Sequence, residues 1–359
     1  MTVPGVLSEA APRPYPRRVR VLVVDDSATM RRLIRLALSA DQRLQVVAEA
    51  ADADAAEQAI MTARPDVLTL DVEMPGMSGL EFLGRLMRQS PRPVVMVSAE
   101  TQRGSAAALE ALSIGAVDCI GKPAGGLGRQ GFAALADLLV AAAGANLRRL
   151  AVVPPAVDAP PSRAFVWNGR HVLIGSSTGG VDALERLLGG FPVNCPPTVI
   201  TQHMPAAFLA GFAARLNARI APRLELATEG AVLRQGCVYL APGGDHHLML
   251  RQGANPSCTL VQAEKRNGHR PSVDMLFESA APFGDRCIAA LLTGMGRDGA
   301  TGMLALRNAG ARTVAQDRAS AVIWGMPRIA AEIGAAQMVL PLDRIAPEIL
   351  AMASRNPAR

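Results

Sequence analysis

Short apolar runs alternate with amphipathic stretches along two lengths of this chain, and this alternation restricts its fold more than any other feature. The first length opens with VRVLVVDD at Val19 and the amphipathic SATMRRLIRLALSA, and it closes with VDCIGKP at Pro123. Five apolar runs separated by helical periodicity predict five parallel strands, with helices covering both faces of the sheet. In doubly wound sheets of this kind, ligands bind beyond the carboxyl ends of the strands.

The second length shows the same alternation, from HVLIGSS at His171 to RTVAQD, which ends at Asp317. We expect a second α/β domain with a mainly parallel sheet and a β-rich middle around GCVYLAPGGDHHLML. Between the two lengths, NLRRLAVVPPAVDAPPSRAF is rich in Pro and lacks periodicity, which is typical of a linker. The expected organisation is a flexible extension at 1–18, a first domain at 19–145, a linker at 146–168 and a second domain at 169–355.

Composition excludes several classes of protein. The net charge is +6, but Lys122 and Lys265 are the only lysines, and an aromatic content of 3% leaves little for base stacking, so we expect no nucleic-acid binding. Five cysteines without a C-x-x-C pair favour reduced thiols in a cytoplasmic protein. Pro and Arg occur near the N-terminus where a signal peptide would need an apolar run, and no later segment reaches membrane-spanning length without charge or Pro, so we expect no membrane insertion.

Charged and polar residues end the predicted strands of the first domain. Asp25 and Asp26 follow the first strand, Asp71 ends the third, Ser98 the fourth, and Lys122 follows the fifth. Carboxylates often end strands simply as turn formers. Three of them at one sheet edge, however, repel one another unless a hard cation such as Mg²⁺ binds among them, and Lys122 supplies a further positive charge.

The first domain resembles a response-regulator receiver domain. The resemblance lies in the motifs VVDDS, LDVEMPGMSGLEFL, MVSA and GKP. The resemblance implies a flavodoxin-like domain phosphorylated on Asp71 by a histidine kinase. It also implies that Asp25, Asp26 and Asp71 bind Mg²⁺ and that Ser98 and Lys122 contact the phosphoryl group. Cys119 stands where the family commonly has an aromatic switch residue, so we expect coupling by other side-chain movements.

The segment VLIGSSTGGVDALERLL in the second domain has three interpretations. Its glycines suit a phosphate-binding turn at a helix N-terminus, and its Ser and Thr suit a helix cap. The stretch from Gly175 to Gly179 also matches G-x-S-x-G, a sharp turn that exposes a reactive serine, here Ser177. A nucleotide-binding loop is disfavoured because the Lys of G-x-x-x-x-G-K-[ST] is missing.

A serine nucleophile needs an imidazole to remove its proton and a carboxylate to orient that imidazole. His203, in TQHMP, and Asp298, in GMGRDG, follow two further strands of the same predicted sheet. The order Ser177, His203, Asp298 differs from the Ser, acid, His order of α/β-hydrolases. The adjacent residues His246 and His247 are competing bases, which we rank second because they lie on a hairpin-like segment.

The second domain closely resembles the methylesterase domain of the CheB family, through IGSSTGG, TQHMP, YLAPGGDHHL, PSVDMLFESAA, LLTGMGRDGA and AQDRASAVIWGMP. The resemblance implies that Ser177, His203 and Asp298 are the catalytic triad, that Thr178 flanks the site and that the backbone of Met295 donates to the oxyanion. It implies a cofactor-free hydrolase that removes methyl esters from glutamates of chemoreceptors, also deamidates glutamines, and is obstructed by its unphosphorylated receiver. The rival hypothesis is a non-enzymatic adaptor, which would lack a triad residue.

Overall fold

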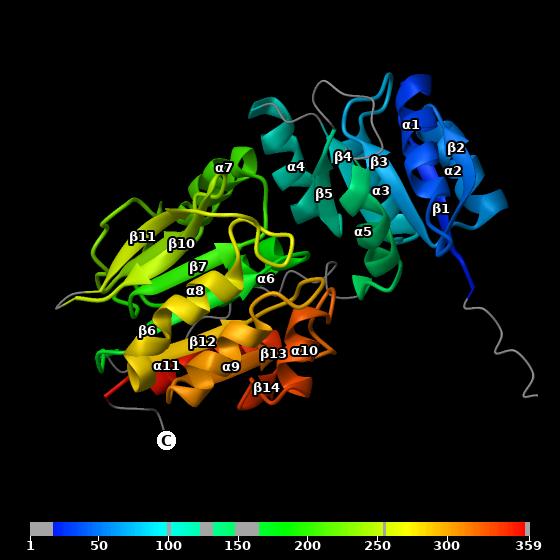
Figure 1. Cartoon of the computed structure of the whole chain (residues 1–359). Coiled ribbons are helices and arrows are strands. Elements are labelled where there is room, and N and C mark those ends of the chain that lie inside the picture. The colour runs from blue at the N-terminus through cyan, green and yellow to red at the C-terminus, as the bar shows by residue number, and fades with distance from the viewer. Residues whose placement is uncertain (1–16, 99–101, 123–131, 148–164, 254–255, 356–359) are drawn as a thin grey trace, which may run out of the picture.

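The computed structural model describes residues 17–98, 102–122, 132–147, 165–253 and 256–355, and they form two α/β units (Figure 1). The first unit has a five-stranded parallel sheet in the order β2-β1-β3-β4-β5. Its strands and helices alternate as follows: β1 (Val19–Val24), α1 (Ala28–Ser39), β2 (Leu44–Ala50), α2 (Ala53–Ala63), β3 (Val67–Asp71), α3 (Gly79–Gln89), β4 (Val94–Ser98), α4 (Gln102–Ile114), β5 (Asp118–Gly121) and α5 (Ala133–Ala143).

The strand order of this sheet determines where its site can lie. The chain moves outward from β1 to β2 and then returns to the other side of β1 with β3, so the order reverses between β1 and β3. All five residues of β3 are buried, because helices cover both faces of the sheet. The crevice at such a reversal is where doubly wound sheets bind ligands, and it is the edge at which Asp25 and Asp71 lie.

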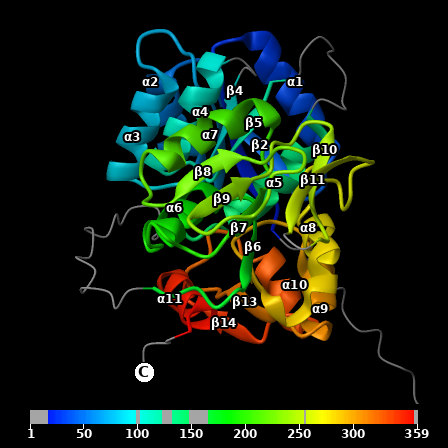
Figure 2. The same ribbon diagram turned by 90° about the vertical axis from the view of Figure 1, so that its left-hand side faces the viewer.

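The second unit contains a seven-stranded sheet in the order β14-β13-β12-β6-β7-β9-β8, in which every neighbouring pair is parallel. An antiparallel ribbon of β10 and β11 lies beside it (Figures 1 and 2). Its elements are β6 (His171–Ser176), α6 (Gly180–Gly189), β7 (Thr198–Gln202), α7 (Ala206–Asn217), β8 (Arg223–Leu226), β9 (Cys237–Leu240), β10 (His246–Arg251), β11 (Ser257–Gln262), α8 (Val273–Ala280), a 3-10 helix (Ala281–Arg286), β12 (Cys287–Leu291), α9 (Ala300–Asn308), β13 (Arg312–Gln316), α10 (Met326–Glu332), β14 (Met338–Leu340) and α11 (Leu342–Ala353).

The central strand β6 is buried along its whole length and pairs with β7 on one side and β12 on the other. Helix α8 packs so closely on it that a Cβ at Gly175 would lie 2.2 Å from Val273 Cγ1. This close packing fixes α8, and the loop before it, against the end of β6.

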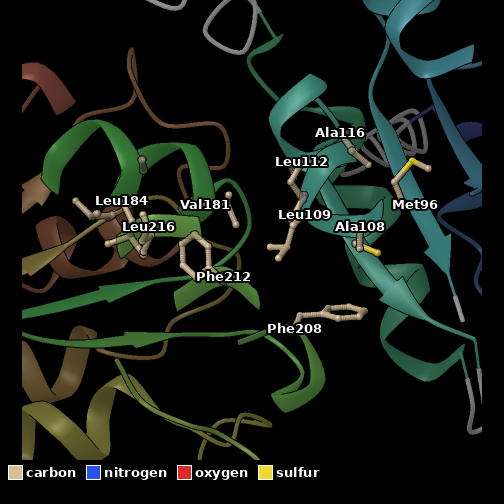
Figure 3. Close-up of a cluster of buried hydrophobic side chains, with 14 of the residues drawn as sticks. Met96, Ala108, Leu109, Leu112, Ala116, Val181, Leu184, Phe208, Phe212 and Leu216 are labelled. Atoms are coloured by element: carbon tan, nitrogen blue, oxygen red, sulfur yellow. The ribbon is translucent and has the colours of Figure 1, made fainter. Parts of the chain in front are cut away.

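An apolar interface joins the two units. Figure 3 shows Leu109 and Leu112 of α4 facing Val181 of α6 and Phe212 of α7, with Phe208 alongside. These side chains are at most 8% exposed and belong to one cluster that continues into both cores. The helices approach so closely that a Cβ at Gly211 would lie 3.0 Å from Leu109 Cδ1. The two units therefore pack through buried apolar surface rather than being joined only by the connecting chain.

The predicted fold class, a doubly wound parallel domain followed by a mainly parallel α/β domain, is confirmed. The predicted extension at 1–18 and linker at 146–168 fall mostly outside the described residues, so the proposed domain boundaries remain predictions. Among the described helices, none combines the length and apolar character that crossing a bilayer requires.

Replacement of Phe82 tests the packing of the first unit. Phe82 of α3 is fully buried, so Phe82→Ala should lower the free energy of unfolding by about 3–5 kcal/mol, through lost burial and the cavity left behind. Leu36→Ala, at a side chain that is 48% exposed on α1, is the matched control and should change it by less than about 0.5 kcal/mol. Urea unfolding followed by circular dichroism measures both, and equal effects would contradict this account of the core.

Candidate active site

Three carboxylates meet at the carboxyl edge of the first sheet. Oxygen atoms of Asp25, Asp26 and Asp71 lie within 4.8 Å of one another, and Asp25 and Asp71 are buried whereas Asp26 is exposed. Lys122 Nζ lies 3.0 Å from Asp25 Oδ2 and 2.8 Å from Asp71 Oδ2. Ser98 ends β4 and pairs with Gly121 of β5, which places its backbone at the same edge.

Burial and charge act against each other at this edge. Burial raises the pKa of Asp71 above its usual range, although the Lys122 ammonium offsets part of the effect. Burial lowers the pKa of Lys122, but its hydrogen bond to Asp71 and the charges of Asp25 and Asp71 outweigh burial and raise it. Lys122 is therefore a persistent cation. An all-oxygen donor set with one exposed carboxylate fits a hard divalent ion such as Mg²⁺.

The turn after β6 does not contain a serine or threonine helix cap. The N-cap position of α6 is Gly179 with φ of 78°, and no side chain caps the helix. Instead, Ser176 Oγ donates to Gln202 Oε1 at 2.6 Å, and Thr178 Oγ1 donates to Asp118 Oδ2 of β5 at 2.5 Å. Among the described residues, Ser177 Oγ has no hydrogen-bond partner, so the capping interpretation is wrong and this hydroxyl is left available.

The two strand ends beside this turn are joined by hydrogen bonds. Ser176 and Gln202 are register partners in the parallel pair of β6 and β7, so Ser177 and His203 are the next residues of neighbouring strands. Gln202 Nε2 donates to the carbonyl oxygens of Ser177 and His203, at 2.9 and 3.0 Å. His203 N donates to Ser176 O at 3.0 Å. Gln202, which the sequence analysis did not single out, thus links the backbones of Ser177 and His203 through its side-chain amide.

Asp298 follows β12 and is almost completely buried. Its Oδ2 forms a hydrogen bond with His203 Nε2, at 2.8 Å. Four further donors reach this carboxylate, which are Asn267 Nδ2, Ser272 Oγ, Val273 N and Asp274 N. Burial alone would raise the pKa of Asp298, but the hydrogen bond and charge of His203, followed by Asn267 and Val273, lower it well below its usual range. Asp298 is therefore a carboxylate.

An ionised Asp298 fixes the tautomer of His203. A carboxylate only accepts hydrogen bonds, so His203 Nε2 carries the hydrogen and Nδ1 carries the lone pair. Nδ1 is buried and has no hydrogen-bond partner among the described residues. It is thus the nitrogen that can accept a proton, whereas chymotrypsin uses Nε2 for this purpose.

The remaining histidines near the site differ in their contacts. His247 is fully buried, with Nε2 3.0 Å from Glu264 O and Nδ1 accepting Ser272 N at 3.1 Å, so both of its nitrogens are occupied. His246 lies half-buried at the start of β10. His269 stacks on His203 with ring centroids 3.7 Å apart and an interplanar angle of 7°.

The first unit covers the serine turn. Ser177, Gly179 and Gln202 line a cavity together with Asp118 and Leu112 of the first unit. The cavity measures about 10 Å³, which is about the space of one water molecule. Burial raises the pKa of Asp118, and the hydrogen bond from Thr178 offsets part of this rise. Asp118 is a further residue that sequence reasoning missed.

The buried carboxylate of Asp298 makes the stability of the second unit depend on pH. A lowered folded-state pKa means that Asp298 stabilises the fold above its ordinary pKa of 3.8, and that this contribution is lost as the pH falls through the folded-state value. Asp298→Asn should therefore lower the free energy of unfolding near neutral pH, by an amount that shrinks below about pH 4. Urea unfolding over a pH series measures it, with Asp54→Asn on the exposed face of α2 as control. A difference independent of pH would contradict the assignment.

Comparison with known proteins gives a family for each unit. Residues 172–349 match the CheB methylesterase family, and residues 21–126 match the response regulator receiver domain family. The catalytic domain of CheB methylesterase from Thermotoga maritima is 37% identical, covers 51% of this chain and 97% of its own, and superposes with a TM-score of 0.49.

Full-length relatives match both units together. The protein-glutamate methylesterase/protein-glutamine glutaminase 1 of Rhizobium johnstonii is 53% identical over 93% of this chain and 96% of its own length. The protein of the same name from Agrobacterium fabrum is 52% identical over 92% and 95%. The chain therefore belongs to the CheB methylesterase family, with a response regulator receiver domain ahead of its methylesterase domain.

Proposed function

We propose that this chain is a protein-glutamate methylesterase and protein-glutamine glutaminase that acts on chemoreceptors and is controlled by phosphorylation of its receiver by a histidine kinase. The observation that carries the proposal is the buried carboxylate of Asp298, which bonds His203 Nε2 and leaves Nδ1 unpaired, while His203 and Ser177 follow the paired ends of neighbouring strands. Relatives named for both activities match nearly the whole chain, which supports the choice of reaction. The five cysteines are free thiols, which favours the cytoplasm as the compartment.

Ser177, His203 and Asp298 divide the reaction among themselves. The Ser177 hydroxyl turns toward His203 Nδ1, gives up its proton and attacks the side-chain carbonyl carbon of a methylated glutamate. Asp298 stabilises the imidazolium, which then protonates the leaving methoxide so that methanol departs. Water, deprotonated by Nδ1, attacks the acyl-enzyme and releases glutamate and the serine hydroxyl. A glutamine side chain follows the same route, with ammonia as the leaving group.

Backbone N–H groups beside Ser177 would stabilise the negative oxygen formed in this step. A Cβ at Gly294 would lie 2.7 Å from Ser177 Cβ, which places Met295 next to the nucleophile. The N–H groups of Met295 and Thr178 have no partners among the described residues and are our assigned donors. One such donor contributes about 2.7–4 kcal/mol to transition-state stabilisation in other hydrolases.

Substitution of the nucleophile and base tests this proposal. Ser177→Ala and His203→Ala should each lower methanol release from methylated receptor membranes by at least about a thousandfold, because the triad acts as a unit. Phosphorylation of Asp71 should be unchanged in both variants. His246→Ala is the matched control and should retain the wild-type rate. Wild-type release by Ser177→Ala would exclude the serine mechanism.

The acidic edge of the receiver has a separate role in regulation. We assign Asp71 as the phosphoryl acceptor, with Asp25, Asp26 and Asp71 holding Mg²⁺ and with Lys122 and Ser98 contacting the phosphoryl oxygens. The ion would offset the negative charge that a phosphoryl group brings next to Asp25 and Asp26. Before phosphorylation, Lys122 neutralises Asp25 and Asp71 directly.

The unphosphorylated receiver obstructs Ser177. The cavity above the serine turn holds about one water molecule, so a glutamate methyl ester reaches Ser177 only when the receiver moves away. A second contact lies at the other side of the site, where Asn146 N donates to Val322 O at 3.2 Å. The side chain of Met295 packs against an apolar cluster that contains residues of α5 together with Val322 and Ile323 of the second unit.

Strand β5 connects the proposed phosphorylation site with the serine turn. Asp118, its first residue, accepts a hydrogen bond from Thr178, and Lys122, directly after its last residue, binds Asp71. A movement of Lys122 toward a phosphoryl group therefore acts on the strand that holds Thr178. This route requires no aromatic switch, and Cys119 lies buried within the strand.

Removal of the Asp118 contact tests this route. Asp118→Ala should raise the methanol release of the unphosphorylated full-length protein about tenfold, which corresponds to about 1.4 kcal/mol between obstructed and open states. Deletion of residues 1–145 should raise it at least as much. Asp54→Ala, an exposed carboxylate on α2, is the control and should leave the rate unchanged. If neither Asp118→Ala nor the deletion raises the rate, obstruction by the receiver is wrong.

A further inference from the structure

The base His203 is held by hydrogen bonding at only one ring atom. Nε2 bonds to Asp298, and Nδ1 has no partner among the described residues. A single hydrogen bond does not by itself fix the tilt of the ring or its rotation about the side-chain bonds. Because proton transfer depends on the direction of the Nδ1 lone pair, a further contact must limit this motion for Nδ1 to stay aimed at the serine side.

The face of His269 supplies such a contact. The two imidazole rings lie parallel within 7°, with centroids 3.7 Å apart. At this separation the ring of His269 blocks tilting of His203 toward it, while Nδ1 at the ring edge remains without a hydrogen-bond partner among the described residues.

A tight turn holds His269 in place. Arg266 and His269 exchange two backbone hydrogen bonds, of 3.1 and 2.9 Å, across Asn267 and Gly268. The φ angles of 52° and 82° at these two residues are typical of a type I′ turn, for which Asn-Gly is the preferred pair. Asn267 Nδ2 also donates to Asp298 Oδ1 at 2.9 Å. The same turn thus positions His269 and supports the carboxylate that orients His203.

The charge state of His269 suits this position. Burial lowers the pKa of His269 to about 4, and the charges of Lys265 and of His203 when it is protonated act in the same direction, against the opposing effect of Asp298. His269 is therefore neutral near neutral pH. It presents an uncharged ring to His203 when that residue becomes an imidazolium, whereas a cation there would oppose the charge.

We propose that His269 is a positioning residue that acts through His203, by stacking a neutral ring on the imidazole and keeping Nδ1 directed toward Ser177. The effect of His269 on the reaction rate rests on the proposed function, in which His203 is the base. It assigns a role to a residue outside the triad, and the role requires a flat, uncharged side chain rather than a histidine as such.

Three variants of the full-length, phosphorylated protein separate stacking from charge. His269→Ala removes the ring, His269→Phe keeps a neutral ring, and His269→Arg keeps a flat group but adds charge. His269→Ala should lower kcat about ten- to a hundredfold with KM nearly unchanged, since misplaced catalytic groups lose rate without losing substrate binding. His269→Phe should recover most of kcat, and His269→Arg should not. His246→Ala is the control.

A proton NMR measurement tests the same positioning without the esterase reaction. The hydrogen between His203 Nε2 and Asp298 should give a downfield resonance, identified by its loss in His203→Ala. It should disappear in His269→Ala and persist in His269→Phe. Unchanged melting temperature and Asp71 phosphorylation establish that each variant is folded.

The outcomes distinguish the inference from the proposed function. If His269→Ala keeps both the wild-type kcat and the resonance, or if kcat and KM change together in the Ala and Phe variants alike, the positioning role is wrong. If the wild-type protein releases no methanol while the resonance responds as expected, the proposed function fails and the positioning role stands.

Discussion

Parallel pairing of β6 with β7 on one side and β12 on the other is the constraint on which the catalytic unit depends. Because the three strands run in the same direction, Ser177, His203 and Asp298 all emerge at one edge of the sheet. A one-residue shift between β6 and β7 would separate Ser176 from Gln202 and move the neighbouring side chains to opposite faces. The buried strands therefore determine the relative placement of the three proposed catalytic residues.

The ionised carboxylate of Asp298 then determines the tautomer of His203. An isolated buried carboxylate is costly, and five donors from His203, the turn at Asn267 and the start of α8 offset that cost. The same donors keep the carboxylate ionised and so determine which nitrogen of His203 can accept a proton. Structural stability and catalytic chemistry thus depend on one set of hydrogen bonds, and the phosphate-loop interpretation of the serine turn offers no account of them.

The residues proposed for regulation also lie at strand ends, in the sheet of the first unit. The acidic edge of the receiver and the serine turn are connected through β5, which bonds Asp71 through Lys122 at one end and Thr178 through Asp118 at the other. The apolar interface between α4 and α7 stabilises the covered arrangement without polar specificity (Figure 3). A rearrangement at Asp71, the proposed phosphorylation site, thus has a short path to the hydrogen bond between Asp118 and Thr178 beside Ser177.

The sequence by itself determined the alternation of strands and helices, the parallel fold class and the strand ends at which chemistry lies, because periodicity and strand-end residues are local signals. It missed the edge strands β8 and β14, which are four and three residues long and partly exposed, so they lack a clear apolar run. It also missed Gln202, His269 and Asp118. Their roles exist only through partners far along the chain, and only tertiary packing decided which ring stacks on His203, which nitrogen is free and which receiver residue covers the serine.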